Sequence, residues 1–215
     1  MESPVCPPTE PDFRLIETFA FRPEQGFVRL QRHLARMARS TDALGIPFDS
    51  DLAIQALNTV SGNDPLRCRL TLDRAGQYEV TTGPLAENPS VWRLGISDIR
   101  LDSSDPWLRY KTTRRAIYDT ARASLPDDMD ELLFLNEKEE LCEGSITNLF
   151  LEMQDERWLT PPLSAGLLPG ILREELLETE KVAEATLTLT DLHEAKNVHM
   201  GNSLRGLIRV ELAIK

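Results

Sequence analysis

The sequence predicts an α+β / α/β protein built from two small domains. In the first half, helical patterns are followed by antiparallel strand patterns, an order that is typical of an α+β layer. The second half mixes strand and helix patterns again. Between them, Ser103-Ser-Asp-Pro106 has the composition of a link. We therefore expect domains at residues 1–103 and 107–215, both of ordinary size.

The first domain is expected to begin with a hairpin and two helices. Leu30, Leu34 and Met37 fall at helical spacing, and Ser50 can cap the second helix. The elements expected here are strands at 13–21 and 27–30, helices at 30–45 and 50–60, strands at 67–72 and 78–82, and a strand pair across 92–101.

Past the link, the second domain is expected to contain two helices and four strands. Those elements are helices at 113–123 and 172–179 and strands at 131–135, 148–153, 185–189 and 197–200. No internal repeat or low-complexity tract is found in the chain.

Composition excludes several classes of function. The chain has 35 acidic and 24 basic residues, a net charge of -11, so nucleic acid is not expected as a partner. Apolar stretches are far shorter than the roughly 20 residues of a membrane span, and the first residues lack an export signal, which predicts a cytoplasmic protein. Three widely spaced cysteines (Cys6, Cys68 and Cys142) and three histidines favour neither disulfides nor a metal site.

Four short segments occur in a fixed order: Lys111-Thr-Thr-Arg, Glu143-Gly-Ser-Ile-Thr-Asn-Leu-Phe150, Gly166-Leu-Leu-Pro-Gly-Ile-Leu-Arg173 and Met200-Gly-Asn-Ser-Leu-Arg-Gly206. Together they resemble the class IV aminotransferases, the pyridoxal-phosphate (PLP) family of branched-chain and D-amino-acid aminotransferases and aminodeoxychorismate lyase. The resemblance covers about residues 15–208. It implies the D-amino-acid-aminotransferase-like fold (fold type IV), with two small α/β domains, the cofactor PLP in the cleft, and a homodimer.

Lys111 is the residue that the resemblance assigns to covalent attachment of the cofactor and to catalysis. A lysine that reacts with an aldehyde must be partly neutral near pH 7, and neighbouring cations favour the neutral amine. Three arginines lie within four residues of Lys111. The branched-chain subgroup has a tyrosine five residues after this lysine, where the present sequence has Ala116. Tyr118 can replace it only if the helix phase allows.

Glu143 matches the carboxylate that the family places beside the ring nitrogen of the cofactor. A carboxylate there keeps the nitrogen protonated, so that the ring accepts electrons from the substrate. Without the resemblance, Glu143-Gly144 would be interpreted as a polar turn before a strand. Asn148, in the same segment, is expected to hold the loop in place.

The donors to the cofactor phosphate come from three segments in this resemblance. A turn that enters a helix presents free N–H groups to an anion, a hydroxyl donates from a later turn, and an arginine in a His-x-x-Arg context binds through its guanidinium. The implied donors are Gly170, Ile171, Leu172, Asn202, Ser203 and Arg36. His33 is expected to pack the helix.

Two arginines are candidates for contact with the substrate. Arg205 either faces a substrate carboxylate or forms a salt bridge at the surface. Arg67 and Arg69 lie in one expected strand, and we expect only one of them, Arg69, to face the site.

The resemblance leaves three functions open. We favour an aminodeoxychorismate lyase-like enzyme, which releases pyruvate and forms 4-aminobenzoate, because of Asn202-Ser-Leu-Arg-Gly206 and Ala116. The alternatives are an amino-acid aminotransferase for branched-chain or D-amino acids, and a PLP-binding protein that has lost turnover. The family usually has some thirty further residues before Glu17, and the resemblance implies that they help to wall the substrate pocket. We therefore expect the identity of the substrate to depend on this difference.

Overall fold

The computed structural model describes residues 13–213, which form two compact units. Unit 1 comprises residues 13–87 and Tyr110–Arg114, and unit 2 comprises Asn88–Arg109 and residues 115–213. These limits differ from the expected 1–103 and 107–215, because residues 91–101 pair with strands of the second sheet. Cys6 lies outside the described residues.

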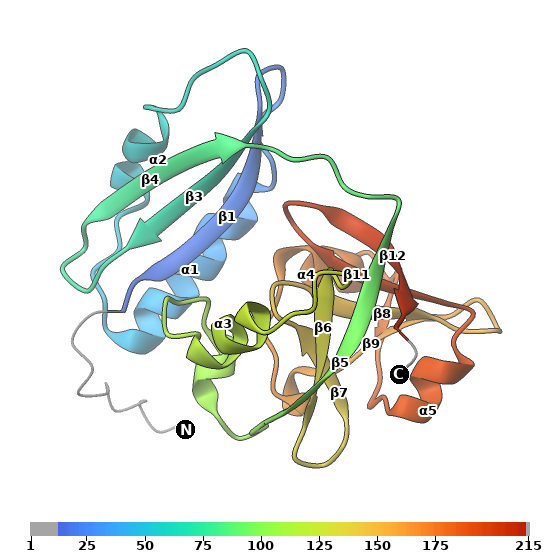
Figure 1. The fold of residues 1–215 in the computed structure, drawn as a ribbon. Coiled ribbons are helices and arrows are strands. Elements are labelled where there is room, and N and C mark those ends of the chain that lie inside the picture. The colour runs from blue at the N-terminus through green and yellow to red at the C-terminus, as the bar shows by residue number, and fades with distance from the viewer. Residues whose placement is uncertain (1–12, 214–215) are drawn as a thin grey trace. The chain divides into compact units, whose positions relative to one another are not determined.

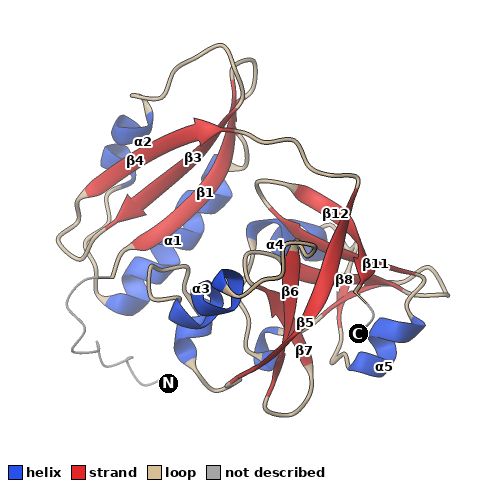
Figure 2. Cartoon of the chain, in the orientation of Figure 1, coloured by secondary structure: helices blue, strands red, loops and turns tan. Residues whose placement is uncertain are grey.

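Unit 1 is a four-stranded antiparallel sheet with two helices (Figures 1 and 2). Its strand order is β2-β1-β3-β4. Its elements are β1 (Leu15–Arg22), β2 (Gly26–Phe27), α1 (Leu30–Leu44), α2 (Ser50–Leu57), β3 (Leu66–Leu72) and β4 (Tyr78–Pro84). The helices and main strands match the sequence-based expectation. Asp49, and not Ser50, caps α2, since its side chain accepts bonds from the N–H groups of Asp51 and Leu52.

The register of β1 and β3 shows which side chains share a face of the sheet in unit 1. Glu17 pairs with Leu70, and Thr18 pairs with Arg69. Arg67 pairs with Ala20, two residues along from Thr18. Because residues two apart in a strand lie on the same face, Arg67 and Arg69 share one face of the sheet. The expectation that only one of them could face the site was therefore wrong.

Unit 2 is an eight-stranded sheet with order β10-β9-β8-β11-β12-β5-β6-β7. An additional pairing of β7 with β8 closes six of these strands into a ring. Its strands are β5 (Val91–Leu101), β6 (Glu131–Asn136), β7 (Leu141–Gly144), β8 (Asn148–Glu152), β9 (Trp158–Thr160), β10 (Ala183–Glu184), β11 (Asn197–Asn202) and β12 (Gly206–Leu212). Its helices are α3 (Ala116–Ala123), α4 (Ile171–Glu178) and α5 (Leu189–Glu194), with short 3-10 turns at Pro106–Arg109 and Leu163–Ala165.

Two apolar clusters fill unit 2. Leucine, valine and methionine side chains of the ring strands form the larger one, which includes Leu133, Leu149 and Met200. A second cluster contains Phe134, Cys142 and Ala121, so α3 packs on the ring through this layer. Burial of these side chains is the main favourable term in folding, and it fixes the strands that carry the motif segments of the site.

Several elements of unit 2 differ from the expectation. The pair of strands expected across 92–101 is one continuous strand, β5. Residues 185–189 do not form a strand; Thr188 and Asp191 form a capping box that starts α5. Strands β7, β9 and β12 were not expected.

Candidate functional site

The site residues of unit 1 gather around a buried carboxylate on β1. Glu17 accepts hydrogen bonds from Arg36 Nε at 2.9 Å and from Arg36 Nη2 at 2.6 Å. His33 Nδ1 lies 2.6 Å from the same carboxylate. Glu17 is 2% exposed and Arg36 is 5% exposed. The side chains of His33 and Arg36, three residues apart on α1, therefore both contact Glu17 on β1.

This cluster has well-defined charges. Burial raises the pKa of Glu17, but the charge of Arg36 and the hydrogen bonds from His33 and Arg36 outweigh it and lower the pKa to about 2. Burial lowers the pKa of His33, the carboxylate of Glu17 raises it, and the positive charges of Arg36 and Lys111 lower it again; the net direction is down. Near neutral pH, Glu17 and Arg36 thus form an ion pair beside a neutral imidazole.

Lys111 belongs to the short segment of unit 1 that pairs with the start of β1. The N–H of Ile16 donates to the carbonyl of Lys111 at 2.8 Å, and the N–H of Thr113 donates to Arg14 at 2.9 Å. The effect of Lys111 on the pKa of His33 shows that it lies within electrostatic range of the Glu17 cluster. The structure therefore brings Lys111 and Arg36 together in one unit, although they are 75 residues apart in the sequence.

In unit 2, Glu143 lies on β7 and is 5% exposed. Tyr118 donates its hydroxyl to Glu143 Oε1 at 2.7 Å, and Asn148 Nδ2 lies 3.4 Å from Oε2. Tyr118 thus contacts the carboxylate expected beside the ring nitrogen. Asn148 also donates to the carbonyl of Leu168 at 3.0 Å and so joins the start of β8 to the loop before α4.

Helix α4 begins at Ile171, with Gly170 as its N-cap and without a capping side chain. The N–H groups of a first helical turn have no partner within the helix, and they attract anions. A Cβ atom at Gly170 would lie 1.9 Å from Asn148 Oδ1. Gly170 is therefore required by the close approach of Asn148, and the segments of Glu143 and Gly170 meet there.

The turn between β11 and β12 carries the remaining candidates of unit 2. Ser203 is buried. Asn202 Nδ2 donates to the carbonyl of Ile146 at 3.1 Å, and Asn202 Oδ1 accepts from the N–H groups of Leu204 and Arg205. Asn202 therefore shapes this turn and joins it to the β7–β8 turn.

Arg205 is half-buried and its side chain contacts Asn88 and Trp92. Its Nη1 lies 3.1 Å from Asn88 Oδ1, and its guanidinium lies 5.4 Å from the ring centroid of Trp92. In unit 1, Arg69 follows the alternation that puts it on the face of the sheet opposite to Glu17. The N–H of Arg205 also donates to Asn202 Oδ1, so Arg205 belongs to the turn that Asn202 shapes.

The residues present fit PLP in their chemistry. Unit 1 supplies a lysine and a guanidinium. Unit 2 supplies a buried carboxylate, an uncapped helix start and a buried hydroxyl. A phosphate needs cationic and N–H donors, a pyridine nitrogen needs a carboxylate, and an aldehyde needs an amine. The donor set of the described residues contains each of these.

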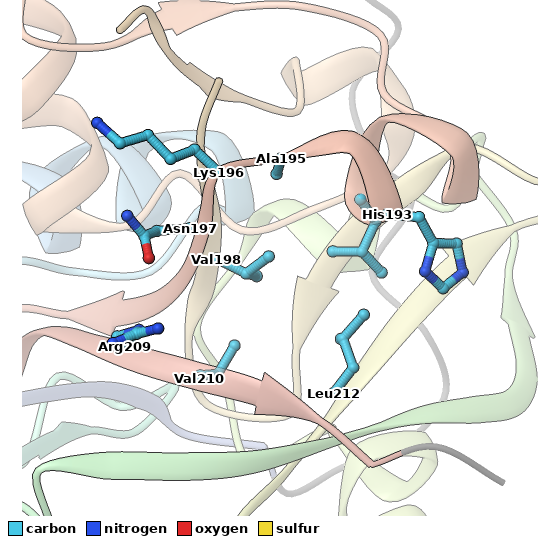
Figure 3. A pocket seen from close by; sticks show the side chains of 9 residues that line it. His193, Ala195, Lys196, Asn197, Val198, Arg209, Val210 and Leu212 are labelled. Atoms are coloured by element: carbon cyan, nitrogen blue, oxygen red, sulfur yellow. The ribbon is translucent and has the colours of Figure 1, made fainter. Parts of the chain in front are cut away.

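A hollow of about 180 Å³ lies elsewhere in unit 2, between α5 and the ends of β11 and β12 (Figure 3). Its lining includes His193, Lys196 and Arg209 and none of the candidate site residues. Within residues 13–213, no group of three or more His, Cys, Asp or Glu side chains could hold a metal ion. No helix in the same range is long and apolar enough to cross a membrane.

Sequence reasoning missed three groups that shape the site. Glu17 was not considered as a site residue, because its contact with Arg36 depends on how α1 packs on β1. Tyr118 was considered only for a different contact. Glu131 was not considered, although an acidic residue in phase with Leu133 and Leu135 along a strand indicates a buried charge.

Comparison with known proteins places the chain in a family. The model of the family described as amino-transferase class IV matches residues 14–213. A crystal structure from Mesorhizobium loti, provisionally named an amino-acid aminotransferase, is 40% identical, with a TM-score of 0.91, and covers 94% of this chain and 100% of its own.

Two further relatives carry the name of a lyase. A Schizosaccharomyces pombe protein, provisionally named aminodeoxychorismate lyase, is 29% identical over 86% of this chain and 84% of its own length. The crystal structure of 4-amino-4-deoxychorismate lyase from Pseudomonas aeruginosa is 25% identical, with a TM-score of 0.80, and covers 93% of this chain and 82% of its own. The family consists of PLP-dependent enzymes, and this chain belongs to the class IV aminotransferases.

Proposed function

We propose that this protein is a PLP-dependent lyase that acts on aminodeoxychorismate, releases pyruvate and leaves 4-aminobenzoate. The observation that carries the PLP part is the buried Glu143 with its hydroxyl donor, in the same unit as the uncapped start of α4. The lyase part is supported by the two relatives named as lyases. It is also supported by Ala116, which stands where branched-chain enzymes have a tyrosine.

In this proposal, the phosphate donors, Glu143 and Lys111 have separate roles. Arg36, Ser203, Asn202 and the N–H groups of residues 170–172 would hold the phosphate, and Glu143 would hold the ring nitrogen protonated. When bound, PLP supplies an aldehyde that reacts with amines and a ring that accepts electrons from the substrate. Lys111 would first attach the cofactor and then, displaced by the substrate amine, remove the proton from the substrate Cα.

An amino-acid aminotransferase is the second candidate, because the 40% identical structure carries that name. The chemistry of Lys111 is the same in both reactions up to the removal of the Cα proton. In the lyase, pyruvate then leaves. In the aminotransferase, Lys111 would return the proton to the cofactor, water would release the keto acid, and the amino group would stay on the cofactor. A second keto acid would then be needed to take up that amino group.

One incubation separates the candidates. The purified protein, loaded with PLP, is given aminodeoxychorismate without any keto acid, and pyruvate and 4-aminobenzoate are measured. Both products at stoichiometric ratio support the lyase. A strict need for a second keto acid identifies an aminotransferase. Bound PLP without turnover on aminodeoxychorismate or on D- and L-amino acids identifies a PLP-binding protein that has lost activity.

The attachment residue has a separate test. Borohydride reduction of the PLP-loaded protein, followed by peptide mapping, is expected to fix the cofactor to Lys111. Attachment at Lys138, Lys181, Lys196 or Lys215 would contradict the assignment. We also propose that the enzyme is a cytoplasmic homodimer, and sedimentation of the loaded protein measures its oligomeric state.

A further inference from the structure

Tyr118 and Glu143 form a contact that the proposed reaction does not assign. The Tyr118 hydroxyl donates to Glu143 Oε1 at 2.7 Å. The Tyr118 ring packs edge-on against Phe134, with ring centroids 5.2 Å apart. Burial raises the pKa of Tyr118, and the negative charge of Glu143 raises it further, so the hydroxyl keeps its proton and remains a donor.

Helix α3 is held in the orientation that makes this contact. Arg115 Nη2 donates to the carbonyl of Ser145 at 2.9 Å, and Arg122 Nη1 donates to Ser145 Oγ at 2.8 Å. Arg115, Tyr118 and Arg122 are spaced three and four residues apart, so they lie along one side of α3. That side contacts Glu143 on β7 and Ser145 in the β7–β8 turn.

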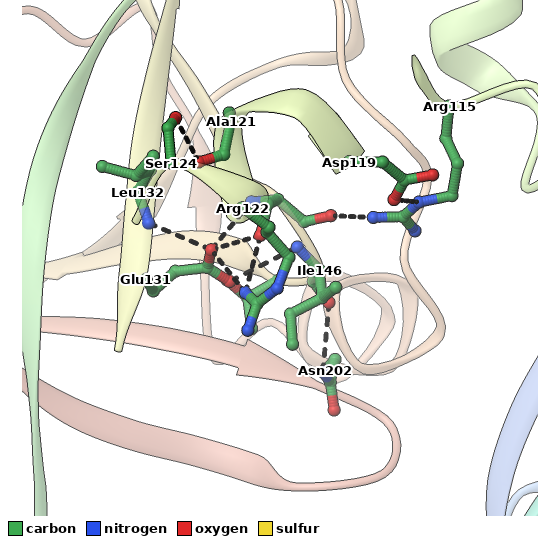
Figure 4. Close-up of polar contacts among 11 residues, drawn as sticks. Arg115, Asp119, Ala121, Arg122, Ser124, Glu131, Leu132, Ile146 and Asn202 are labelled. Carbon is green, nitrogen blue, oxygen red and sulfur yellow. Dashed lines mark hydrogen bonds and ion pairs between the residues drawn. The ribbon is translucent and has the colours of Figure 1, made fainter. Parts of the chain in front are cut away.

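A second buried carboxylate holds the turn itself. Glu131 is 0% exposed. It accepts hydrogen bonds from Ser145 Oγ at 2.5 Å, from Thr147 Oγ1 at 3.0 Å and from the N–H of Ser145 at 3.1 Å. Asn202 reaches the same turn through the carbonyl of Ile146 (Figure 4). Helix α3, which carries Tyr118, and the turn after Glu143 are thus both held by hydrogen bonds of their own. The hydrogen bond between Tyr118 and Glu143 is therefore part of a fixed network.

We propose that Tyr118 is a positioning residue that orients Glu143 and keeps it ionised beside the cofactor's ring nitrogen. A carboxylate oxygen accepts more than one hydrogen bond, so Glu143 can take the bond from Tyr118 and still face a ring N–H. A hydrogen bond donated to the ionised form lowers the proton affinity of a carboxylate. With Tyr118 in place, Glu143 would leave the proton on the ring nitrogen of bound PLP, and the protonated ring would supply a stronger electron acceptor. The proposal rests on the proposed function.

The test is Tyr118→Phe, which removes the hydroxyl and keeps the ring against Phe134. The ¹⁵N chemical shift of PLP labelled at the ring nitrogen reports directly where the proton lies. We expect this shift to move toward that of neutral pyridine in the variant, with PLP still bound at one equivalent. We also expect kcat to fall by roughly tenfold, the loss of one hydrogen bond to a charged group, with KM changed less than twofold.

Tyr78→Phe is the matched control, because the hydroxyl of Tyr78 is also hydrogen-bonded, to the carbonyl of Asp49 in unit 1. It should leave the ¹⁵N shift and kcat unchanged. A double-mutant cycle adds a check: Tyr118→Phe should have little further effect on kcat in a Glu143→Gln background, since Tyr118 acts through Glu143.

The outcomes separate this proposal from the proposed function. If wild-type protein fails to bind PLP, the proposed function fails. If wild-type protein binds PLP and turns over, and Tyr118→Phe has the wild-type ¹⁵N shift, Tyr118 does not tune Glu143 and the present proposal is overturned. Loss of PLP and of folding together in Tyr118→Phe would also overturn it, because Tyr118 would then be a packing residue of α3.

Discussion

Arg36 binds Glu17 through two parallel hydrogen bonds, of 2.9 and 2.6 Å, inside unit 1. Such a bidentate pair fixes the plane of the guanidinium. Both groups are buried, so neither can be removed without leaving the other as an uncompensated charge. The residue proposed to bind the cofactor phosphate is therefore also part of the structure of unit 1.

Glu17→Gln is expected to lower the free energy of unfolding by roughly 3–5 kcal/mol, because it leaves the Arg36 charge buried without its partner. Chemical denaturation followed by circular dichroism measures the change. Glu24→Gln is the control, since Glu24 is an exposed residue of the turn after β1 and should change stability by no more than about 0.5 kcal/mol. Equal stabilities of the two variants would show that the Glu17–Arg36 pair adds nothing to the fold.

The stability of the protein should fall in acid through two groups of the same cluster. Glu17 has a folded pKa of about 2 against a usual value of 4.5, so its contribution is complete above pH 4.5 and is lost as the pH falls toward 2. The pKa of His33 is lowered from 6.5 in the folded protein. As the pH falls below 6.5, the unfolded chain therefore binds a proton at His33 more readily than the folded protein does, and stability falls.

Unfolding curves measured from pH 7 to pH 3 separate the contribution of Glu17. The difference in unfolding free energy between wild type and Glu17→Gln should shrink as the pH falls below 4.5, by about 2 kcal/mol at pH 3. A difference that stays constant to pH 3 would show that the pKa of Glu17 is not depressed.

Most of unit 1 could be predicted from the sequence. Helix α1 and strands β3 and β4 have strong periodicity and clear turn residues, so pattern alone locates them. Strand β7 was not predicted, because Glu143-Gly144 is polar and resembles a turn. The Glu143 carboxylate is buried because β7 lies between β6 and β8 in the ring of strands, a pairing that the local sequence does not show. The strand expected at 185–189 does not form, because its apolar alternation ends in a capping box. This local signal outweighs five residues of alternation.

The candidate site was predicted from the resemblance and not from periodicity. Lys111, Glu143 and Gly170 were identified through motifs, and their roles stay proposals. The contacts of Glu17 and Tyr118 could not have been predicted, because each joins a strand to a helix and depends on the rotation of that helix. No pattern along the chain encodes such a rotation.

Loss of Arg36 should weaken PLP binding by about 1.5–3 kcal/mol, the contribution of a charge-assisted pair with phosphate. To avoid a buried unpaired Glu17, the test uses the double variant Glu17→Gln with Arg36→Met. PLP affinity is measured by fluorescence titration of the folded protein. Arg39→Ala, an exposed arginine on the same helix, is the control. Wild-type affinity in the double variant would remove Arg36 from the proposed phosphate site.

Gly170→Ala should damage both the fold of unit 2 and PLP binding. The added Cβ would lie 1.9 Å from Asn148 Oδ1, so Asn148 must move and lose its bonds to Leu168 and Glu143. Overpacking of this kind costs about 1–3 kcal/mol of stability. Gly83→Ala is the matched control, since its Cβ would come no closer than 3.8 Å to any neighbouring atom, and it should be nearly neutral.

The mechanism of the Gly170 effect can be separated from simple crowding. If Gly170→Ala acts by displacing Asn148, then Asn148→Ala should cause a similar loss of PLP affinity, and the double variant should lose little more than either single variant. Additive losses of affinity would instead indicate that Gly170 and Asn148 act independently. In that case, the backbone at the start of α4 would itself be displaced by the new methyl group, since its N–H groups are the proposed phosphate donors.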